Sequence, residues 1–294
     1  MTDSAAGSIY DLGYRNYDGI RLGRRHAIWA LYLHSLRGVF GIGRSFWAKA
    51  GPIGITILAF LPAILQLGIG ALATQEVNIF EPEEYYRLIQ VLLAVFCAIG
   101  APELVGRDQR TKTLSLYFSR ALRRQDYALG KFAAMLTGML SITLLPQLLM
   151  FVGKAVTGDD FGDYLRDNWE DLPAIVGSAL LLSSLFAGIG LLIASQTSRR
   201  AYSTIGILAA FVLTFAIAEA IFHSADEDVG KFVLLVSPFH VFEGLTLWFF
   251  DVSPDPDRRR AMVDLPGIVF VLEAIALSSL LLALLIRRYE RISA

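Results

Sequence analysis

Six long apolar stretches separated by polar segments limit what this chain can fold into. They lie at about 52–73, 88–105, 132–153, 173–195, 202–222 and 266–286. A helix needs roughly 20 apolar residues to cross the hydrocarbon core of a bilayer. Every backbone polar group at that depth must be bonded within the protein. The sequence therefore predicts an all-α integral membrane protein with six transmembrane helices.

Composition agrees with the membrane class. Of the 294 residues, 55% are hydrophobic and 18% are charged, whereas a typical soluble domain is about 25% charged. Residues 1–25 are polar and carry no apolar core of the signal-peptide type, so we expect a cytoplasmic tail followed by one six-span domain over 26–290. The single cysteine, Cys97, lies in an apolar stretch and is expected to be a small buried side chain.

A seventh apolar stretch, residues 231–250, is interrupted by Ser237 and Pro238 and then by Glu243. Proline inside a helix removes a hydrogen bond and kinks or breaks the helix. We therefore expect two half-helices forming a hairpin that re-enters the outer membrane face. A seventh span is the alternative, because the two arrangements place equal numbers of positive charges inside.

Basic residues predict the orientation. Most of the 26 Lys and Arg lie in the N-terminal segment, in 105–131, at 199–200 and in the C-terminal tail, whereas acidic residues gather in 76–84 and 159–171. Cytoplasmic loops carry an excess of Lys and Arg. We therefore expect a multi-pass protein of the inner or plasma membrane with both termini cytoplasmic, Arg258–Arg260 outside and Arg287–Arg291 inside.

Residues 104–131, between the second and third stretches, combine seven Arg and Lys with apolar residues at three- and four-residue spacing. This pattern predicts a basic amphipathic helix at about 107–124 on the cytoplasmic side. A surface of this kind is suited to a cytoplasmic partner, and binding to anionic lipid is the simpler alternative.

Residues 26–48 precede the first span and carry Trp29 and Trp47 broadly on one side, with Arg37 and Arg44 on another. Tryptophan and arginine are typical of the headgroup level of a membrane. We expect a helix lying along the inner membrane surface, with an ordinary juxtamembrane linker as the alternative. Glycines at 38, 41 and 43 weaken the helix without excluding it.

The sequence lacks the motifs of several kinds of chemistry. Its three Gly-Lys pairs are followed by Phe132, Ala155 and Phe232, where a phosphate-binding loop needs Ser or Thr. We therefore expect no ATP hydrolysis by this chain, which is not expected to be an enzyme. The four histidines are scattered and predict no metal site. We expect membrane lipid as a partner, and no nucleic acid and no cofactor on this chain.

Three carboxylates lie in or near the predicted spans: Glu219, Glu243 and Glu273. Ionisable groups in a membrane are costly and usually face protein or water. With six spans, all three fall in the outer half. They could line a path for a cationic substrate, although helix packing with hydrogen-bonded carboxylates is the favoured interpretation. The spacings Gly68-x-Gly70 and Gly188-x-Gly190 permit close helix approach.

Together, these features resemble the ABC type-2 permeases, the export-type membrane subunits of ATP-binding-cassette transporters. The closest local similarity is TLSLYFSRALRRQDYALGK at 113–131. The family often shows Gly-Thr-Leu, a leucine-rich helix, Ser-Arg-Pro, a further Arg and then Gly-Lys at the third span. This chain departs twice, with Lys112 for Gly and Ala121 for Pro. Ser237-Pro238-Phe239 resembles the family's outer hairpin, and the resemblance covers about 26–290.

The resemblance implies a mechanism. Two permease subunits, either a homodimer or a pair with a related permease, would each sit on a separate ABC ATPase subunit that binds ATP and Mg. The helix at about 107–124 would be a coupling helix fitting a groove on the ATPase, and the loop Gln196–Arg200 would be a second contact. The expected coupling residues are Leu116, Phe118, Arg120, Arg123, Arg124, Arg199 and Arg200.

Two other classes stay open. A secondary transporter would need inverted repeats with polar residues near the midplane, and no convincing repeat is found. An intramembrane enzyme would need paired catalytic residues within its spans, which the isolated Glu219 and Glu273 do not obviously provide. The cargo is open among hydrophobic drugs, peptides, lipids and cofactor precursors.

Overall fold

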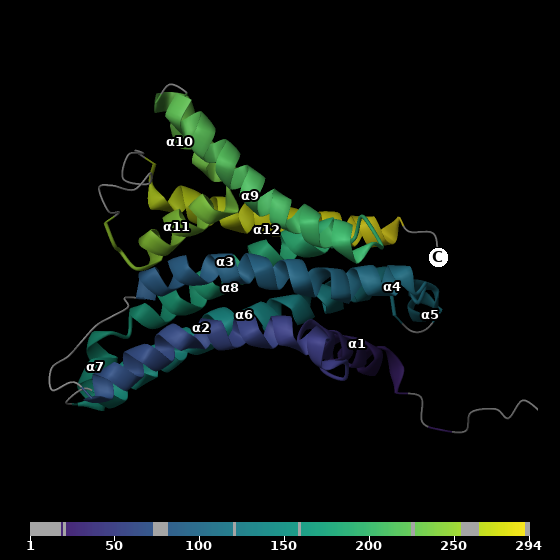
Figure 1. Cartoon of the computed structure of the whole chain (residues 1–294), viewed down its shortest axis with the longest axis horizontal. Coiled ribbons are helices and arrows are strands. Elements are labelled where there is room, and N and C mark those ends of the chain that lie inside the picture. The colour runs from purple at the N-terminus through teal and green to yellow at the C-terminus, as the bar shows by residue number, and fades with distance from the viewer. Residues whose placement is uncertain are drawn as a thin grey trace, which may run out of the picture.

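The chain folds into a bundle of long helices that run side by side along one axis (Figure 1). The computed structural model describes residues 19, 22–72, 82–119, 122–157, 160–224, 227–253 and 265–291. All regular structure in these ranges is helical. The predicted tail 1–25 and the arginines at 258–260 lie largely or wholly outside them.

Six helices of the described part are long and apolar enough to cross a membrane, which confirms the predicted fold class. They are α2 (Phe46–Leu72), α3 (Pro82–Ala101) with its continuation, α6 (Arg124–Thr157), α8 (Asp171–Ala194), α9 (Arg200–Ser224) and α12 (Gly267–Glu290). The α3 span continues through the π-helix η1 (Pro102–Gly106) into α4 (Arg107–Arg110). The other elements are α1 (Gly23–Val39), α5 (Leu114–Phe118), α7 (Phe161–Asp167), α10 (Glu227–Val233), the 3-10 helix η2 (Leu234–Val236) and α11 (Pro238–Phe249).

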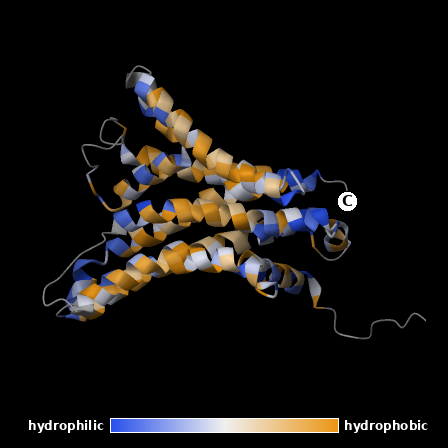
Figure 2. Cartoon of the chain, viewed as in Figure 1, coloured by the Kyte–Doolittle hydropathy of each residue, from blue (hydrophilic) through white to orange (hydrophobic). Residues whose placement is uncertain are grey.

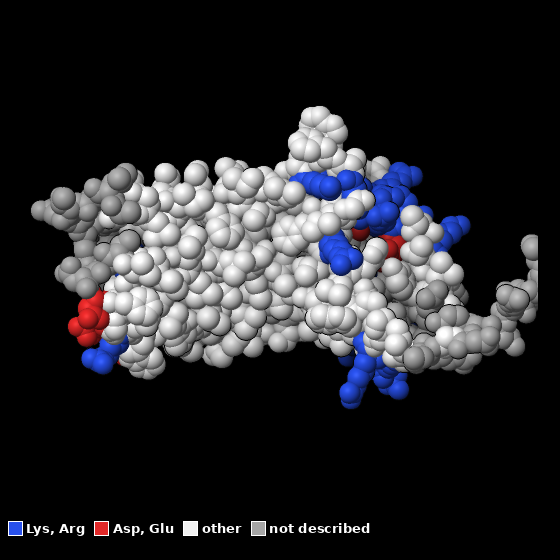
Figure 3. All heavy atoms as spheres, turned by 90° about the horizontal axis from the view of Figure 1, so that it is seen from below, with Lys and Arg blue, Asp and Glu red and all other residues white. Residues whose placement is uncertain are grey.

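The two ends of the bundle differ from its middle. One end, called the basic end here, carries α1, α4, α5, the turn between α8 and α9, and the last turn of α12; the opposite end carries α7, α10 and α11 (Figure 1). Apolar residues dominate the middle of the helices (Figure 2). On the face drawn in Figure 3, a broad uncharged belt separates the ends, and Lys and Arg gather at the basic end.

Close approach of α8 to its neighbours forms part of the core. A Cβ atom at Gly190 would lie 2.1 Å from the Cys97 sulfur, and one at Gly188 would lie 3.0 Å from the Leu281 Cβ. Glycine therefore lets α8 approach both α3 and α12. The prediction for Cys97 is confirmed, because its side chain is fully buried and its thiol donates to the Phe186 carbonyl at 3.2 Å.

The continuous helix expected over 107–124 is wrong. Its described part consists of α4, a turn and α5, and the next helix, α6, already begins at Arg124. The turn contains Lys112 with a φ of 56°, a left-handed conformation that no α-helix accommodates and that glycine adopts most easily. In the family pattern that the sequence resembles, glycine stands at the position of Lys112. The backbone therefore keeps a glycine-type turn despite the substitution.

The continuous helix expected over 26–48 is also wrong. α1 ends at Val39 and α2 begins at Phe46. Gly41 lies between them with a φ of 66°, and a Cβ there would be 2.6 Å from the Ala48 carbonyl oxygen. The chain folds back too tightly at this point for any residue with a side chain. α1 packs mainly on α6.

The interrupted stretch at 231–250 bends sharply at its serine and proline. The helical pair 230–236 and 238–249 is bent by 102° at the intervening residue. Ser237 has extended dihedral angles and Pro238 begins α11, where its missing N–H costs nothing. The end of α9, the bent pair and the start of α12 all lie at the opposite end of the bundle (Figure 1). A bend of this size fits either the predicted re-entrant hairpin or a broken seventh span.

Candidate functional site

The segment α4–α5 is fastened to the bundle by aromatic packing. The rings of Tyr117 and Phe118 lie 5.6 and 5.9 Å from the ring of Tyr127 on α6, measured between centroids. The Arg124 guanidinium lies 5.6 Å from the Phe118 ring centroid. Leu116 points the other way, with 64% of its surface exposed. α5 thus has one face on the bundle and one face available to a partner.

A buried ion pair joins α4 to α6. Lys131 Nζ lies 2.8 Å from Asp108 Oδ2, and the Lys131 side chain is only 3% exposed. Tyr127 donates its hydroxyl to the same carboxylate oxygen at 2.8 Å. The Tyr127 ring in turn packs edge-on against Tyr289 of α12 at 4.9 Å. The carboxylate of Asp108 therefore joins α4 to α6, and the Tyr127 ring extends this contact to α12.

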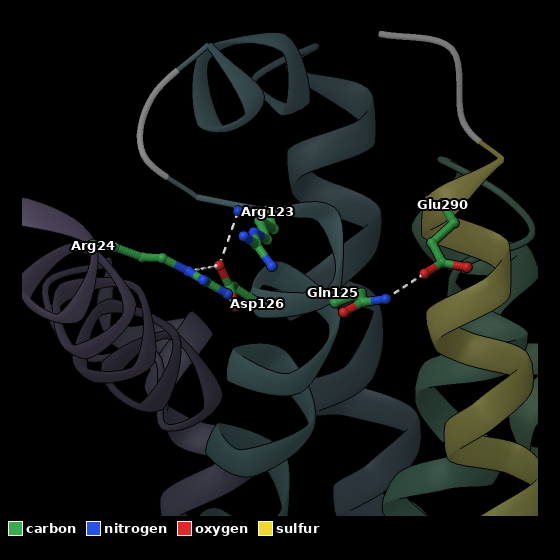
Figure 4. Close-up of polar contacts among 5 residues, drawn as sticks. All are labelled: Arg24, Arg123, Gln125, Asp126 and Glu290. Carbon is green, nitrogen blue, oxygen red and sulfur yellow. Dashed lines mark hydrogen bonds and ion pairs between the residues drawn. The ribbon is translucent and has the colours of Figure 1, made fainter.

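A second carboxylate, Asp126, sits in the first turn of α6 and joins it to α1 (Figure 4). Arg24 donates two hydrogen bonds to Asp126, at 2.8 and 2.6 Å. The hydrogen bond with Asp126 raises the pKa of Arg24. The backbone N–H of Arg123 also donates to Asp126, at 2.9 Å. An acidic side chain here stabilises the positive end of the helix dipole.

The start of α6 is also tied to the end of α12. Gln125 Nε2 donates to Glu290 Oε1 at 2.6 Å, as Figure 4 shows. The Arg124 guanidinium donates to the Glu290 carbonyl at 2.7 Å. One turn of α6 is consequently bonded to both α1 and α12.

A third carboxylate, Glu103, lies on the π-helix η1. It pairs with Arg44, from the turn before α2, and with Arg200 at the start of α9, whose distance is 2.8 Å. π-Helical turns are frequently found at functional sites. Close by, Gln109 of α4 donates to the Ser195 carbonyl at 2.9 Å. The α4–α5 segment and the turn between α8 and α9 are therefore connected.

The predicted coupling residues divide into two groups. Leu116 and Arg199 are exposed, and the Arg199 guanidinium lies 5.4 Å from the Tyr202 ring centroid. Phe118, Arg124 and Arg200 contact other elements of the chain, and the Arg200 side chain is also 51% exposed. Arg123 has an exposed side chain, and its backbone is bonded to Asp126. Arg120 lies outside the described residues.

Sequence reasoning missed the carboxylates that organise this end. Glu103, Asp108 and Asp126 all lie within or beside the stretch that was interpreted through its positive charges. Lys131 was counted among the charges of a loop, yet it is a buried residue of α6. The available signal was the presence of three acids among seven bases in residues 103–131.

A polar cavity of about 220 Å³ opens among α1, α4, α5 and α6. Its lining is rich in charged and hydroxyl groups: His34, Ser35, Gly38, Arg44, Glu103, Leu104, Arg107, Asp108, Thr111, Thr113, Tyr117 and Lys131. Partial desolvation, and then the charge of Lys131, lower the pKa of His34. Both effects favour the neutral form of the imidazole over the charged form.

The two cavities described, of about 230 and 220 Å³, do not bring the three predicted carboxylates together. Glu219 Oε1 lies 3.2 Å from Nε2 of His240, a buried residue of α11 whose ring stacks on Phe215. This contact joins α9 to the bent pair. Glu243 lines a different cavity, of about 230 Å³, together with Glu83, Glu84 and Arg87.

Glu273 is half-buried on α12 and lines neither of these two cavities. Among the described residues, no group of three His, Cys, Asp or Glu side chains is placed to hold a metal ion.

Taken together, the fold and these contacts define a multi-span helical membrane protein in which a surface segment is bonded to the spans behind it. The chain belongs to the ABC-2 family of transporter proteins, because the model of that family, described as ABC-2 family transporter protein, matches residues 3–293. A search of curated proteins gave no significant match. The family assignment makes this chain the membrane component of an ABC transporter.

Proposed function

We propose that this chain is the permease subunit of an ABC exporter, powered by ATP hydrolysis on a separate ATPase subunit that holds ATP and Mg. The observation that carries the proposal is the α4–α5 segment, with an exposed Leu116 on one side and the Asp108–Lys131 ion pair on the other. In a member of the ABC-2 family, such a segment is suited to pass a movement of a bound ATPase to the spans.

The α4–α5 segment is joined to two spans, and these connections support the proposed transmission of movement from the ATPase. α4 continues α3 without a break through η1, and α6 starts only six residues after α5 ends at Phe118. Packed helices move as nearly rigid bodies because protein interiors are dense. A displacement of α5 would therefore act on the α3 and α6 spans together.

The turn between α8 and α9 is the second proposed contact with the ATPase. Gln196 and Arg199 are exposed there, while the neighbouring Ser195 carbonyl accepts from Gln109 of α4. An ATPase that binds both the α4–α5 segment and this turn would therefore contact two elements that are bonded to each other. Arg200 is better suited to hold α9 against Glu103 than to contact a partner.

A second permease copy, or a related permease, completes the proposed assembly. α2 and α9 are the least enclosed of the six candidate spans, and their exposed apolar residues could face either lipid or a partner. The basic end is proposed to be cytoplasmic, in keeping with the positive-inside rule. Labelling of Asp257→Cys in a Cys97→Ser background from outside only would support this six-span orientation, and labelling only from the cytoplasm would contradict it.

Co-purification with a co-expressed ABC ATPase tests the coupling surface. Leu116→Ala and Arg123→Glu should each weaken association at least tenfold, because truncation of a central contact residue often costs about 2 kcal/mol or more. Trp169→Ala is the matched control, since Trp169 is 59% exposed at the opposite end. Wild-type association and transport in both test variants would instead favour a segment that only binds lipid.

ATP turnover provides a second test. The isolated chain should hydrolyse no ATP, and turnover should appear only with the ATPase subunit. Turnover by the purified chain alone, after contaminating ATPases are excluded, would contradict the proposed division of labour. Phe118→Ala should reduce transport more than association, because Phe118 packs on Tyr127 within the same chain.

A further inference from the structure

The cavity at the basic end contains a hydroxyl group that nothing in the described structure satisfies. Ser35 is 1% exposed and lines the cavity, and its Oγ atom has no hydrogen-bond partner. A buried polar group without a partner costs free energy. The volume of about 220 Å³ is large enough for several waters or one small polar group. The cavity therefore has both the room and an unused hydroxyl for a hydrogen-bonding ligand.

The charges around the cavity favour an anion. Arg44, Arg107 and Lys131 all line it, and all three lower the pKa of the neighbouring His34 by their positive charge. The two lining carboxylates are already engaged by cations: Asp108 by Lys131, and Glu103 by Arg44 and Arg200. Counting Arg200, four cations face two carboxylates. Lys131 also has three donors, of which the ion pair with Asp108 uses one.

The position of the cavity indicates the kind of anion. Trp47 and Phe46, at the start of the first span, are 84% and 74% exposed, and Trp29 of α1 is 58% exposed. Exposed tryptophans at the end of a span are typical of the headgroup level. Arg44 stands two residues before Phe46 and lines the cavity. Phosphate groups of phospholipids are abundant at this depth.

We propose that the cavity bounded by Ser35, Arg107 and Lys131 binds a phosphate group, carried by an anionic phospholipid headgroup or by soluble phosphate. Arg107 supplies an exposed guanidinium at the rim, and Lys131 and Ser35 supply donors from the buried wall. Hydrogen bonds to a charged phosphate oxygen are shorter than hydrogen bonds between neutral groups and roughly twice as strong. This site goes beyond the transport function and depends on neither an ATPase nor a cargo.

Native mass spectrometry of the delipidated full chain, titrated separately with phosphatidylglycerol, diacylglycerol and inorganic phosphate, tests the site. One tightly bound phosphatidylglycerol is expected, with diacylglycerol binding much more weakly because it lacks the phosphate. Arg107→Gln should weaken the phosphatidylglycerol complex about tenfold, and Ser35→Ala about threefold, as expected for losing one charged and one neutral hydrogen bond.

Two controls match these variants. Arg110→Gln changes an exposed arginine of the same short helix that does not line the cavity, and Ser178→Ala removes another buried, unpartnered hydroxyl located on α8. Both should bind like the wild type. Melting temperatures of all variants would establish that each is folded, and Ser35→Ala tests the site even if Arg107→Gln is unstable.

Competition separates the two sources of phosphate. If millimolar inorganic phosphate leaves the phosphatidylglycerol complex intact, the lipid headgroup is the ligand; if it displaces the lipid with the same dependence on Arg107 and Ser35, soluble phosphate is the ligand. Equal binding by wild type, Arg107→Gln and Ser35→Ala overturns the proposal. An equal loss in Arg110→Gln, or diacylglycerol binding as tight as phosphatidylglycerol, overturns it as well.

Discussion

Ion pairs join the helices at the basic end of the bundle, and buried tyrosine hydroxyls join them at the opposite end. At the basic end, Lys131 pairs with Asp108 and Arg24 with Asp126. At the opposite end, two adjacent and fully buried tyrosines of α3 do similar work without charge: Tyr85 donates to the Ile142 carbonyl of α6 at 2.8 Å, and Tyr86 to the Ile175 carbonyl of α8 at 2.7 Å. At the basic end α4, the continuation of α3, is thus joined to α6, and at the opposite end α3 is joined to α6 and α8.

The difference lies in how readily each kind of contact can be exchanged. Glu103 already accepts two cations from different elements, Arg44 and Arg200, so one partner can leave while the carboxylate stays paired. A tyrosine hydroxyl supplies a single donor, which in each of these two contacts is already used by one helix carbonyl. The basic end is therefore the part in which we expect helices to shift, and the tyrosine pair is expected to act as a fixed point.

Removing one charge from the buried ion pair should have the largest effect on stability. Lys131→Met leaves Asp108 charged and unpaired, and breaking such a pair typically costs about 3–5 kcal/mol. Thermal unfolding in detergent should detect this loss. The double variant Asp108→Asn with Lys131→Met should recover most of it, because no buried charge is left. A single variant as stable as the wild type would mean that the pair contributes little to the basic end.

The tyrosine contacts should each contribute less. Tyr86→Phe removes one hydroxyl and should lower the free energy of unfolding by about 1 kcal/mol, with no dependence on salt. Tyr202→Phe is the control, because Tyr202 is exposed and its hydroxyl accepts a long hydrogen bond of 3.4 Å from the neighbouring Arg199. If Tyr86→Phe is as stable as Tyr202→Phe, the buried hydroxyl contributes nothing, and the tyrosine pair is not a fixed point of the bundle.

Salt should weaken the ion pair between Arg24 and Asp126 at the basic end, and this effect should be smaller still. The Arg24 side chain is 43% exposed, so its pairing with Asp126 is partly screened as the Debye length falls from about 10 Å at 0.1 M to about 3 Å at 1 M salt. The melting-temperature difference between wild type and Arg24→Gln should therefore shrink with added salt. A difference that is constant across this range would show that packing, rather than charge, holds α1 on α6.

The smallest expected effect is stabilising. Lys112→Gly places glycine at the left-handed turn between α4 and α5 and should stabilise the protein by about 0.5 kcal/mol, because the relief of backbone strain exceeds the added entropy of the unfolded chain. Arg110→Gly, within the helix α4, should have the opposite sign. Calorimetric melting of both variants measures the difference. Destabilisation by Lys112→Gly would contradict the left-handed turn.

Several features could be predicted from the residues alone. The six apolar stretches gave the number and order of the candidate spans, and Ser237-Pro238 marked the sharp bend. The short pattern at 113–131 indicated the family that the full-length match later established. These predictions succeeded because crossing a bilayer requires long apolar helices, and proline limits the local backbone. Neither requirement depends on which other segment lies nearby.

The pairing of charges was decided only by the tertiary structure. Arg24 and Asp126 are 102 positions apart in the chain. Glu103 forms ion pairs with one arginine from the turn before α2 and one from the start of α9. Amphipathic spacing also predicted one helix where α4 and α5 are separated by a turn at Lys112. By itself the sequence determined which segments are apolar enough to span a membrane. Which polar groups meet was decided by the approach of the helices, because a carboxylate is stabilised by whichever cation the packing brings within reach.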